Sequence, residues 1–190
     1  MTKTLWQDRA IALLTVAAVM SCTAAIAQTK PAPKKPAKPE PTEQAVLLGQ
    51  FGDWGAYQAS PGGKKVCFAL SKPKVSQTNP PGRKRDPAYL FVSTRPAENV
   101  RNEVSVIIGY SFKPNSEATA EVGSTSFALS TQQDGAWVKN ATEEAHMVEA
   151  LRAGQSAIVK GVSAKGTRST DTFSLRGLAQ ALDRVEQECK

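Results

Sequence analysis

Histidine and cysteine are scarce in this chain, whose 190 residues include one histidine and three cysteines. With a single histidine and no Cys-x-x-Cys spacing, the sequence holds no pattern for a metal site, and we expect neither a metal nor another cofactor. A Gly-x-Ser-x-Gly nucleophile motif and a glycine-rich phosphate loop are also missing. Because no catalytic signature is present, we expect a protein that is not an enzyme.

Long hydrophobic runs are missing as well, since no segment reaches the ~18 apolar residues typical of a transmembrane helix. The apolar run Ala10–Met20 is shorter, follows Lys3 and Arg9, and precedes the small-residue sequence Ala25-Ile26-Ala27. This order is typical of a signal peptide. We therefore expect residues 1–27 to be removed on export, and the mature protein to be periplasmic or secreted without an integral membrane span.

The three cysteines suggest an alternative to cleavage of the leader and a disulfide in the mature protein. The leader sequence Val19-Met20-Ser21-Cys22 loosely resembles a lipobox, so a lipoprotein tethered through Cys22 is the alternative to cleavage after Ala27. In either case Cys67 and Cys189 remain, and two cysteines in an oxidising compartment usually pair. We expect a Cys67–Cys189 disulfide, with a reactive thiol or metal ligation as the competing interpretations.

Composition divides the rest of the chain into a linker and one domain. Residues 28–45 begin with QTKPAPKKPAKPEP, in which proline alternates with lysine and no large apolar side chain occurs. Such a segment cannot bury a core, so we predict a disordered linker. It serves as a spacer or as a cationic arm attracted to anionic lipid or cell-wall polymer. Residues 46–190 have the composition of one globular domain.

Short strands separated by turns dominate this domain. Phe51–Leu70 predicts a hairpin around Pro61-Gly62-Gly63-Lys64, with Trp54 in the core and Asp53 at a turn. Val66–Leu70 is apolar on both faces and predicts a strand between two layers. Further strands are predicted over residues 88–94, 104–110, 118–122, 125–131, 136–138, 155–162 and 167–173. This spacing is typical of a mainly β sandwich.

Two helices interrupt the strand pattern. The first follows the Trp137 strand, from an Asn140 N-cap to Arg152 before Gly154. Its predicted buried side consists of Ala145, Val148 and Leu151, and His146 faces solvent. The second runs from Ser174 to the C-terminus, with an apolar stripe formed by Leu175, Leu178, Leu182, Val185 and Cys189. We expect this stripe to pack on the domain beside Cys67.

Positive charge is in excess, with 24 lysines and arginines against 17 acidic residues. The densest cluster, Arg83-Lys84-Arg85, lies in the proline-rich segment Lys72–Pro87, which predicts a long surface loop. Such a cluster is either solvated charge or a binding site for an anionic partner. We place the partner-binding site at Arg83, Lys84 and Arg85. The expected partner is an envelope component, a host-surface protein or an anionic polymer, and export argues against nucleic acid.

Two other classes of function remain open. Ser71-Lys72-Pro73-Lys74 matches Ser-x-x-Lys, but Pro73 prevents the helix that this catalytic motif requires. A periplasmic hydrolase would instead need a site assembled from distant polar residues such as Asp53, Arg95, Arg101 and Glu103. A chaperone-like or structural accessory protein is the third possibility.

Several of these features together resemble the invasion-associated locus B family. They are the signal peptide, Phe51-Gly52-Asp53-Trp54, Cys67-Phe68-Ala69-Leu70, the segment from Arg95-Pro96 to Gly109, and the final helix ending in Cys189. The resemblance covers residues 46–190 and implies an Ig-like β-sandwich exported by Gram-negative bacteria, with a role in host-cell entry. It implies no catalytic residues. Many relatives have a cysteine soon after Gly-Asp-Trp, where this chain has Tyr57-Gln58-Ala59.

Overall fold

The structure, a computed structural model, describes residues 44–190. The predicted signal peptide, Cys22 and nearly all of the predicted linker therefore lie outside the described residues. The strands are β1 (Val46–Phe51), β2 (Trp54–Ala59), β3 (Val66–Ser71), β4 (Val75–Asn79), β5 (Tyr89–Arg95), β6 (Val100–Ile107), β7 (Glu117–Val122), β8 (Thr125–Gln132), β9 (Gly135–Val138), β10 (Ser156–Val162) and β11 (Arg168–Ser174). The helices are α1 (Ala141–Ala153) and α2 (Leu178–Glu188), with short 3₁₀ turns η1 (Pro61–Gly63) and η2 (Pro96–Glu98).

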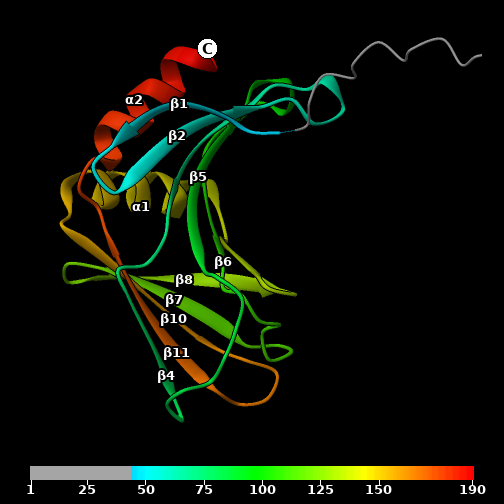
Figure 1. Cartoon of the computed structure of the whole chain (residues 1–190), viewed down its shortest axis with the longest axis vertical. Helices are drawn as coiled ribbons and strands as arrows, with labels where there is room; N and C mark the ends of the chain where they lie inside the picture. Colours follow the sequence, from blue (N-terminus) through cyan, green and yellow to red (C-terminus); the bar gives the residue numbers. More distant parts are fainter. Residues whose placement is uncertain (1–43) are drawn as a thin grey trace, which may run out of the picture. The chain divides into compact units, whose positions relative to one another are not determined.

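The strands pair antiparallel in one 11-stranded sheet, in the order β1-β2-β3-β5-β6-β9-β8-β7-β10-β11-β4. Figure 1 shows β1, β2 and β5 next to α2, and β7, β8, β10, β11 and β4 at the other end of the domain. The predicted mainly β fold with a helix after the Trp137 strand and another at the C-terminus is confirmed. None of the helices in residues 44–190 is long and apolar enough to cross a membrane.

One buried apolar cluster joins the two ends of the sheet. It includes Trp54 and Leu90 from the α2 end and Val159 and Phe173 from the other end, all at most 1% exposed. Trp54 also donates its indole N–H to the carbonyl of Ser174 at 2.8 Å, so β2 is tied to the end of β11. The prediction that Trp54 lies in the core is therefore confirmed.

Strand β3 shows how alternation divides the faces of the sheet. Cys67 and Ala69 are fully buried on the side of α2, whereas Phe68 points to the other face and is half-buried. On that face Phe68 stacks on Tyr57 at 5.4 Å between ring centroids and lies 5.9 Å from Phe91. Aromatic side chains from neighbouring strands therefore cover this face, where the sequence predicted a second layer.

Helix α1 begins and ends where its caps predict. The side chain of Asn140 accepts a hydrogen bond from the N–H of Glu143 at 2.9 Å, and Gly154 is the C-cap. The buried side consists of Met147, Val148 and Leu151. The predicted burial of Ala145 is wrong, because the helix is rotated so that Met147 fills the core and Ala145 is exposed.

Helix α2 carries the predicted stripe on its buried side, but it begins at Leu178 and not at Ser174. Ser174 is still paired with Ser156 in the sheet, and the chain turns at Gly177 with a φ of 94°. A Cβ at Gly177 would lie 1.9 Å from the carbonyl oxygen of Phe51, so only glycine fits at this turn. The helix therefore starts after the turn.

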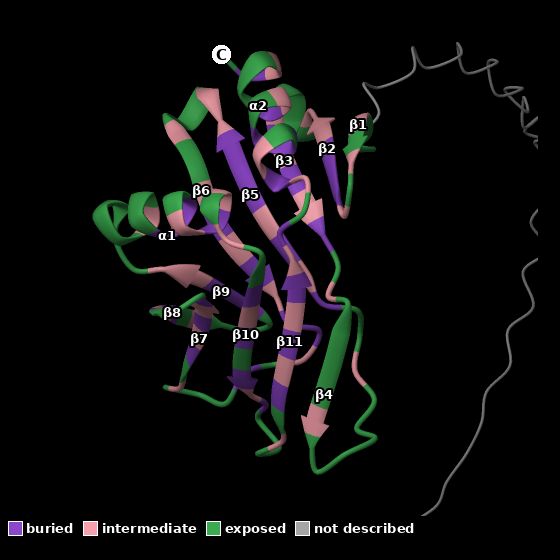
Figure 2. Cartoon of the chain, turned by 90° about the vertical axis from the view of Figure 1, so that its left-hand side faces the viewer, coloured by how far each residue is buried: buried purple, intermediate pink, exposed green. Residues whose placement is uncertain are grey.

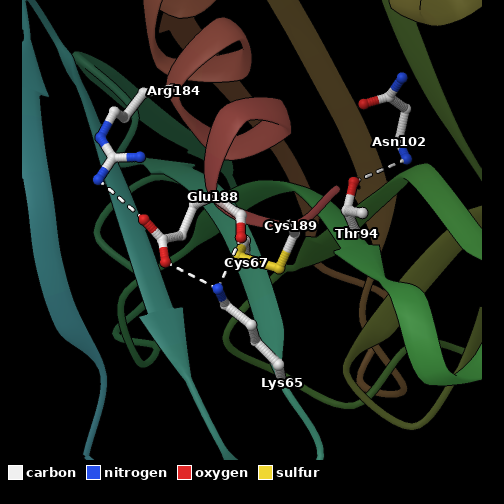
Figure 3. The surroundings of a disulfide bond; sticks show 7 residues. All are labelled: Lys65, Cys67, Thr94, Asn102, Arg184, Glu188 and Cys189. Carbon is white, nitrogen blue, oxygen red and sulfur yellow. Dashed lines mark hydrogen bonds and ion pairs between the residues drawn. A yellow bond between two sulfur atoms is a disulfide. The ribbon is translucent and has the colours of Figure 1, made fainter.

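The predicted disulfide is present between Cys67 on β3 and Cys189 at the end of α2, with their Cα atoms 5.9 Å apart. Figure 3 shows that Glu188, next to Cys189, lies between Lys65 and Arg184. Its carboxylate accepts from Lys65 at 2.7 Å and from Arg184 at 2.9 Å. These cations lower the pKa of Glu188, Lys65 more than Arg184. The C-terminal end of α2 is thus held by a covalent bond and by ion pairs.

The segment Lys72–Pro87 differs from the prediction of a continuous surface loop. Its first half forms β4, which pairs with β11 and is the last strand of the sheet. Most of β4 is exposed, as Figure 2 shows, and the flanking prolines lie outside the strand. Proline excludes an inner strand but is compatible with a short strand at an edge, which explains the difference.

Candidate functional site

The cations of the loop after β4 line a cavity of about 600 Å³, here called the cationic cavity. Its other wall is the turn between β10 and β11. The lining residues are Thr78, Arg83, Lys84, Arg85, Tyr110, Ser111, Ser163, Ala164, Lys165 and Thr167. The cavity therefore combines cationic side chains from two separate segments with several hydroxyl groups, and none of its lining residues is acidic.

Arg85 is fixed inside the protein by two contacts. Its Nη2 pairs with Oδ1 of Asp171 on β11, and its Nη1 donates to the carbonyl of Ile108 at 2.7 Å. Asp171 is fully buried, and the same oxygen accepts from the hydroxyl of Ser76 on β4 at 2.7 Å. Its other oxygen, Oδ2, has no hydrogen-bond partner within residues 44–190. Arg85 thus compensates a buried carboxylate and anchors the loop.

Tyr110 extends this polar network toward the cationic cavity. Its hydroxyl and that of Ser169 on β11 are 2.6 Å apart, and the guanidinium of Arg85 lies 5.8 Å from the centre of its ring. Burial raises the pKa of the Tyr110 phenol, which therefore stays neutral at physiological pH. Tyr110 can offer a neutral hydroxyl and the edge of a ring to a ligand.

The turn between β10 and β11 holds Lys165 at the rim of the cavity. The N–H of Ala164 donates to the carbonyl of Ser111 at 2.8 Å, and the N–H of Ser163 donates to that of Thr167 at 2.8 Å. The first bond fixes the turn against the segment that follows β6, and the second closes the turn itself. The side chain of Lys165 remains exposed.

The predicted cluster Arg83-Lys84-Arg85 therefore consists of two kinds of residue. Arg85 is mostly buried in its ion pair, with 10% of its side chain exposed. Arg83 and Lys84 are exposed, and neither forms a salt bridge with a described residue. With Lys165 they provide three accessible cations, which together with hydroxyl donors are suited to an anionic group.

The four residues of the hydrolase hypothesis do not form one site, although two of them, Arg95 and Glu103, are paired. Gly55 is in register with Leu70 and, through it, with Phe91 of β5, so Asp53 lies near the start of β5. Arg95 is at the opposite end of that strand and forms a bidentate pair with Glu103 at 2.7 and 3.0 Å. Glu103 raises the pKa of Arg95 above its ordinary value.

Asp53 has partners of its own, Lys74 at 2.5 Å and Arg176 at 3.4 Å. Lys74 is the main reason that the pKa of Asp53 lies well below its usual range. Arg101 is exposed and lines two smaller cavities near the helices. Within residues 44–190 no group of three or more His, Cys, Asp or Glu side chains is placed to hold a metal ion.

The sequence did not predict that Lys165 and Tyr110 line the cationic cavity, or that Asp171 pairs with Arg85. Lys165 lies 80 positions beyond Arg85 by residue number, and only the pairing of β10 with β11 and β11 with β4 brings it near. Tyr110 was assigned only to a strand. The burial of Asp171 could have been predicted, because strand alternation places it on the same face as Phe173. A buried carboxylate requires a partner.

The comparisons with known proteins give one match. The family model described as "Invasion associated locus B (IalB) protein" matches residues 56–186, which is more than half of the chain. Neither the curated proteins nor the solved structures contain a match.

Proposed function

Since the chain belongs to the invasion-associated locus B family, we propose that it is an exported, non-catalytic binding protein of the cell envelope that holds an anionic partner at the cationic cavity. The observation that carries the proposal is the group of three accessible cations, Arg83, Lys84 and Lys165, around one cavity. An anion there would exchange its hydration for charge-assisted hydrogen bonds.

The difference between Arg85, which is paired inside the protein, and the accessible Arg83 and Lys84 supports a binding role for the loop. A buried ion pair such as Arg85–Asp171 does little for stability compared with well-packed apolar residues. Here it fixes the backbone that presents Arg83 and Lys84. A site held in place before the ligand arrives loses less conformational entropy on binding. Arg85 is in this proposal a positioning residue, and the neighbouring cations contact the partner.

Two sources of the anionic partner fit the proposal. One is the bacterial envelope itself, whose lipids and polymers are anionic. The other is a host-cell surface, since the family is named for invasion. Both would present negative charge to the same cavity, and separate binding measurements distinguish them.

The test is cosedimentation of the purified protein with outer-membrane vesicles at low salt, and in parallel its adhesion to cultured host cells. The double variant Arg83→Glu, Lys84→Glu should lose retention, because it reverses the two accessible charges and leaves Arg85 in place. The control Lys64→Glu, Lys190→Glu makes the same change in net charge at exposed residues outside the cavity and should bind as the wild type. Equal retention of both variants would remove the proposal.

Export is tested separately. Cell fractionation should find the protein in the periplasm or medium, and mass spectrometry should find a mature N-terminus at Gln28. A chain with an intact leader in the cytosol would contradict the location.

A further inference from the structure

The cationic loop Arg83-Lys84-Arg85 separates the cationic cavity from a second hollow. This second hollow, here called the edge cavity, has a volume of about 920 Å³ and runs along β4. Thr78, Arg83, Lys84 and Arg85 line both cavities. The two cavities therefore meet at the loop, and Arg83 and Lys84 are accessible from both.

Each cavity has a further lysine that the other lacks. Lys165 lines the cationic cavity, and Lys72 lines the edge cavity. The Lys72 ammonium lies 5.5 Å from the centre of the Tyr89 ring, which holds it beside the sheet without neutralising it. Lys74, two residues on, is neutralised by Asp53 and is not a lining residue of the edge cavity. Accessible positive charge thus continues from Lys165 over the loop to Lys72.

Acidic side chains are few along this row of cations. Asp86 is the one acidic residue that lines either cavity. Asp86 and Asp134 line a smaller hollow of about 400 Å³ next to Tyr110 and Ser111. An anionic chain is repelled there, so the favourable course runs between Lys165 and Lys72.

On these observations, and resting on the proposed function, we propose that the partner is a linear acidic glycan lying across both cavities, with its negative groups at Lys165, at Arg83 and Lys84, and at Lys72. A single small anion would fill one cavity and leave the cations of the other unused. Hydroxyl and amide side chains occur along both cavities, among them Ser111, Thr167 and Gln77. These side chains can form hydrogen bonds with the hydroxyl groups of a sugar chain. A polyphosphate has no such hydroxyl groups along its chain.

The binding of oligogalacturonates of one, three and six sugar units to the purified protein tests this proposal, by calorimetry at low salt. The six-unit chain should bind about tenfold or more tighter than the three-unit chain, because it reaches cations in both cavities at once. Lys72→Gln and Lys165→Gln should each remove most of this gain. Lys64→Gln is the matched control and should keep the gain.

The outcomes separate the two proposals. Binding of all three lengths with equal affinity would overturn the linear partner and keep the proposed anion-binding function. If a polyphosphate of equal charge binds as tightly as the six-unit glycan, the inference that the partner is a glycan is overturned. If none of the probes binds, and Arg83→Glu, Lys84→Glu also retains vesicle binding, the proposed function itself fails.

Discussion

The two ends of the domain are stabilised in different ways. At the α2 end, Cys67 and Cys189 are joined covalently, and the helix packs an apolar stripe against the sheet. At the β4 end, a buried ion pair between Arg85 and Asp171 and the pair Tyr110–Ser169 add to the apolar packing of residues such as Phe173. In the first arrangement, the charges nearest the disulfide, Lys65, Arg184 and Glu188, pair with one another. The second keeps an array of cations at the surface, at the cost of a buried carboxylate that depends on one arginine.

The largest expected effect is at the β4 end. Arg85→Ala should lower the free energy of unfolding by about 3–5 kcal/mol, because Asp171 stays buried without its counter-charge. Urea unfolding followed by circular dichroism measures the loss. The double variant Arg85→Ala, Asp171→Asn should be more stable than the single variant, since it removes the unpaired charge. A single variant as stable as the wild type would show that the pair does not support this end.

The next effect is at the α2 end. Reduction of the disulfide should lower the free energy of unfolding by about 2–5 kcal/mol, because it releases a loop that constrains the unfolded chain. Unfolding with and without dithiothreitol measures it. The variant Cys67→Ala, Cys189→Ala should match the reduced protein and not respond to dithiothreitol. A wild type whose unfolding does not change with dithiothreitol would contradict the expected contribution.

The smallest effect is the pH dependence at the same end. Glu188 has a pKa below its ordinary value of 4.5 because Lys65 and Arg184 favour the carboxylate. The unfolded chain therefore binds more protons near that pH, so this stabilisation is present above pH 4.5 and is lost as the pH falls below it.

Glu188→Gln tests this contribution through thermal unfolding at a series of pH values. The variant should be less stable than the wild type at neutral pH, and the difference should shrink as the pH falls through the acid range. Glu186→Gln, an exposed neighbour on α2, is the control and should show no such convergence. A difference that stays constant with pH would mean that the ion pairs of Glu188 contribute nothing.

Local patterns made most of the secondary structure predictable. The Asn140 cap and Gly154 predicted the bounds of α1, and the spacing of leucines predicted which face of α2 is buried. The cysteine count, together with the expected export, predicted the disulfide. Two errors arose where local sequence preference did not decide the structure. The prolines in the segment after Lys72 favoured a loop where the edge strand β4 forms, and the turn at Gly177 makes α2 begin later than predicted.

The sequence predicted some of the residues of the candidate site but not which of them are paired inside the protein. The sequence marked Arg83 and Lys84 as cations on an exposed segment, and the structure leaves them accessible. It could not show that Arg85, their neighbour, is used internally, because its partner Asp171 is 86 residues away. Lys72 is likewise a surface lysine in the sequence and becomes part of a cavity only through the return of the chain after β4.

The sequence by itself determined most of the strands, the presence of both helices and the disulfide. Periodicity and capping depend on residue type and local order, and the small number of cysteines limits the possible pairs. Tertiary structure decided which cations remain accessible around the cationic cavity. The reason is that strands distant in the sequence pair with one another and bring their side chains together. The buried carboxylate of Asp171 pairs with Arg85, whereas Arg83, Lys84 and Lys165 remain accessible around one cavity.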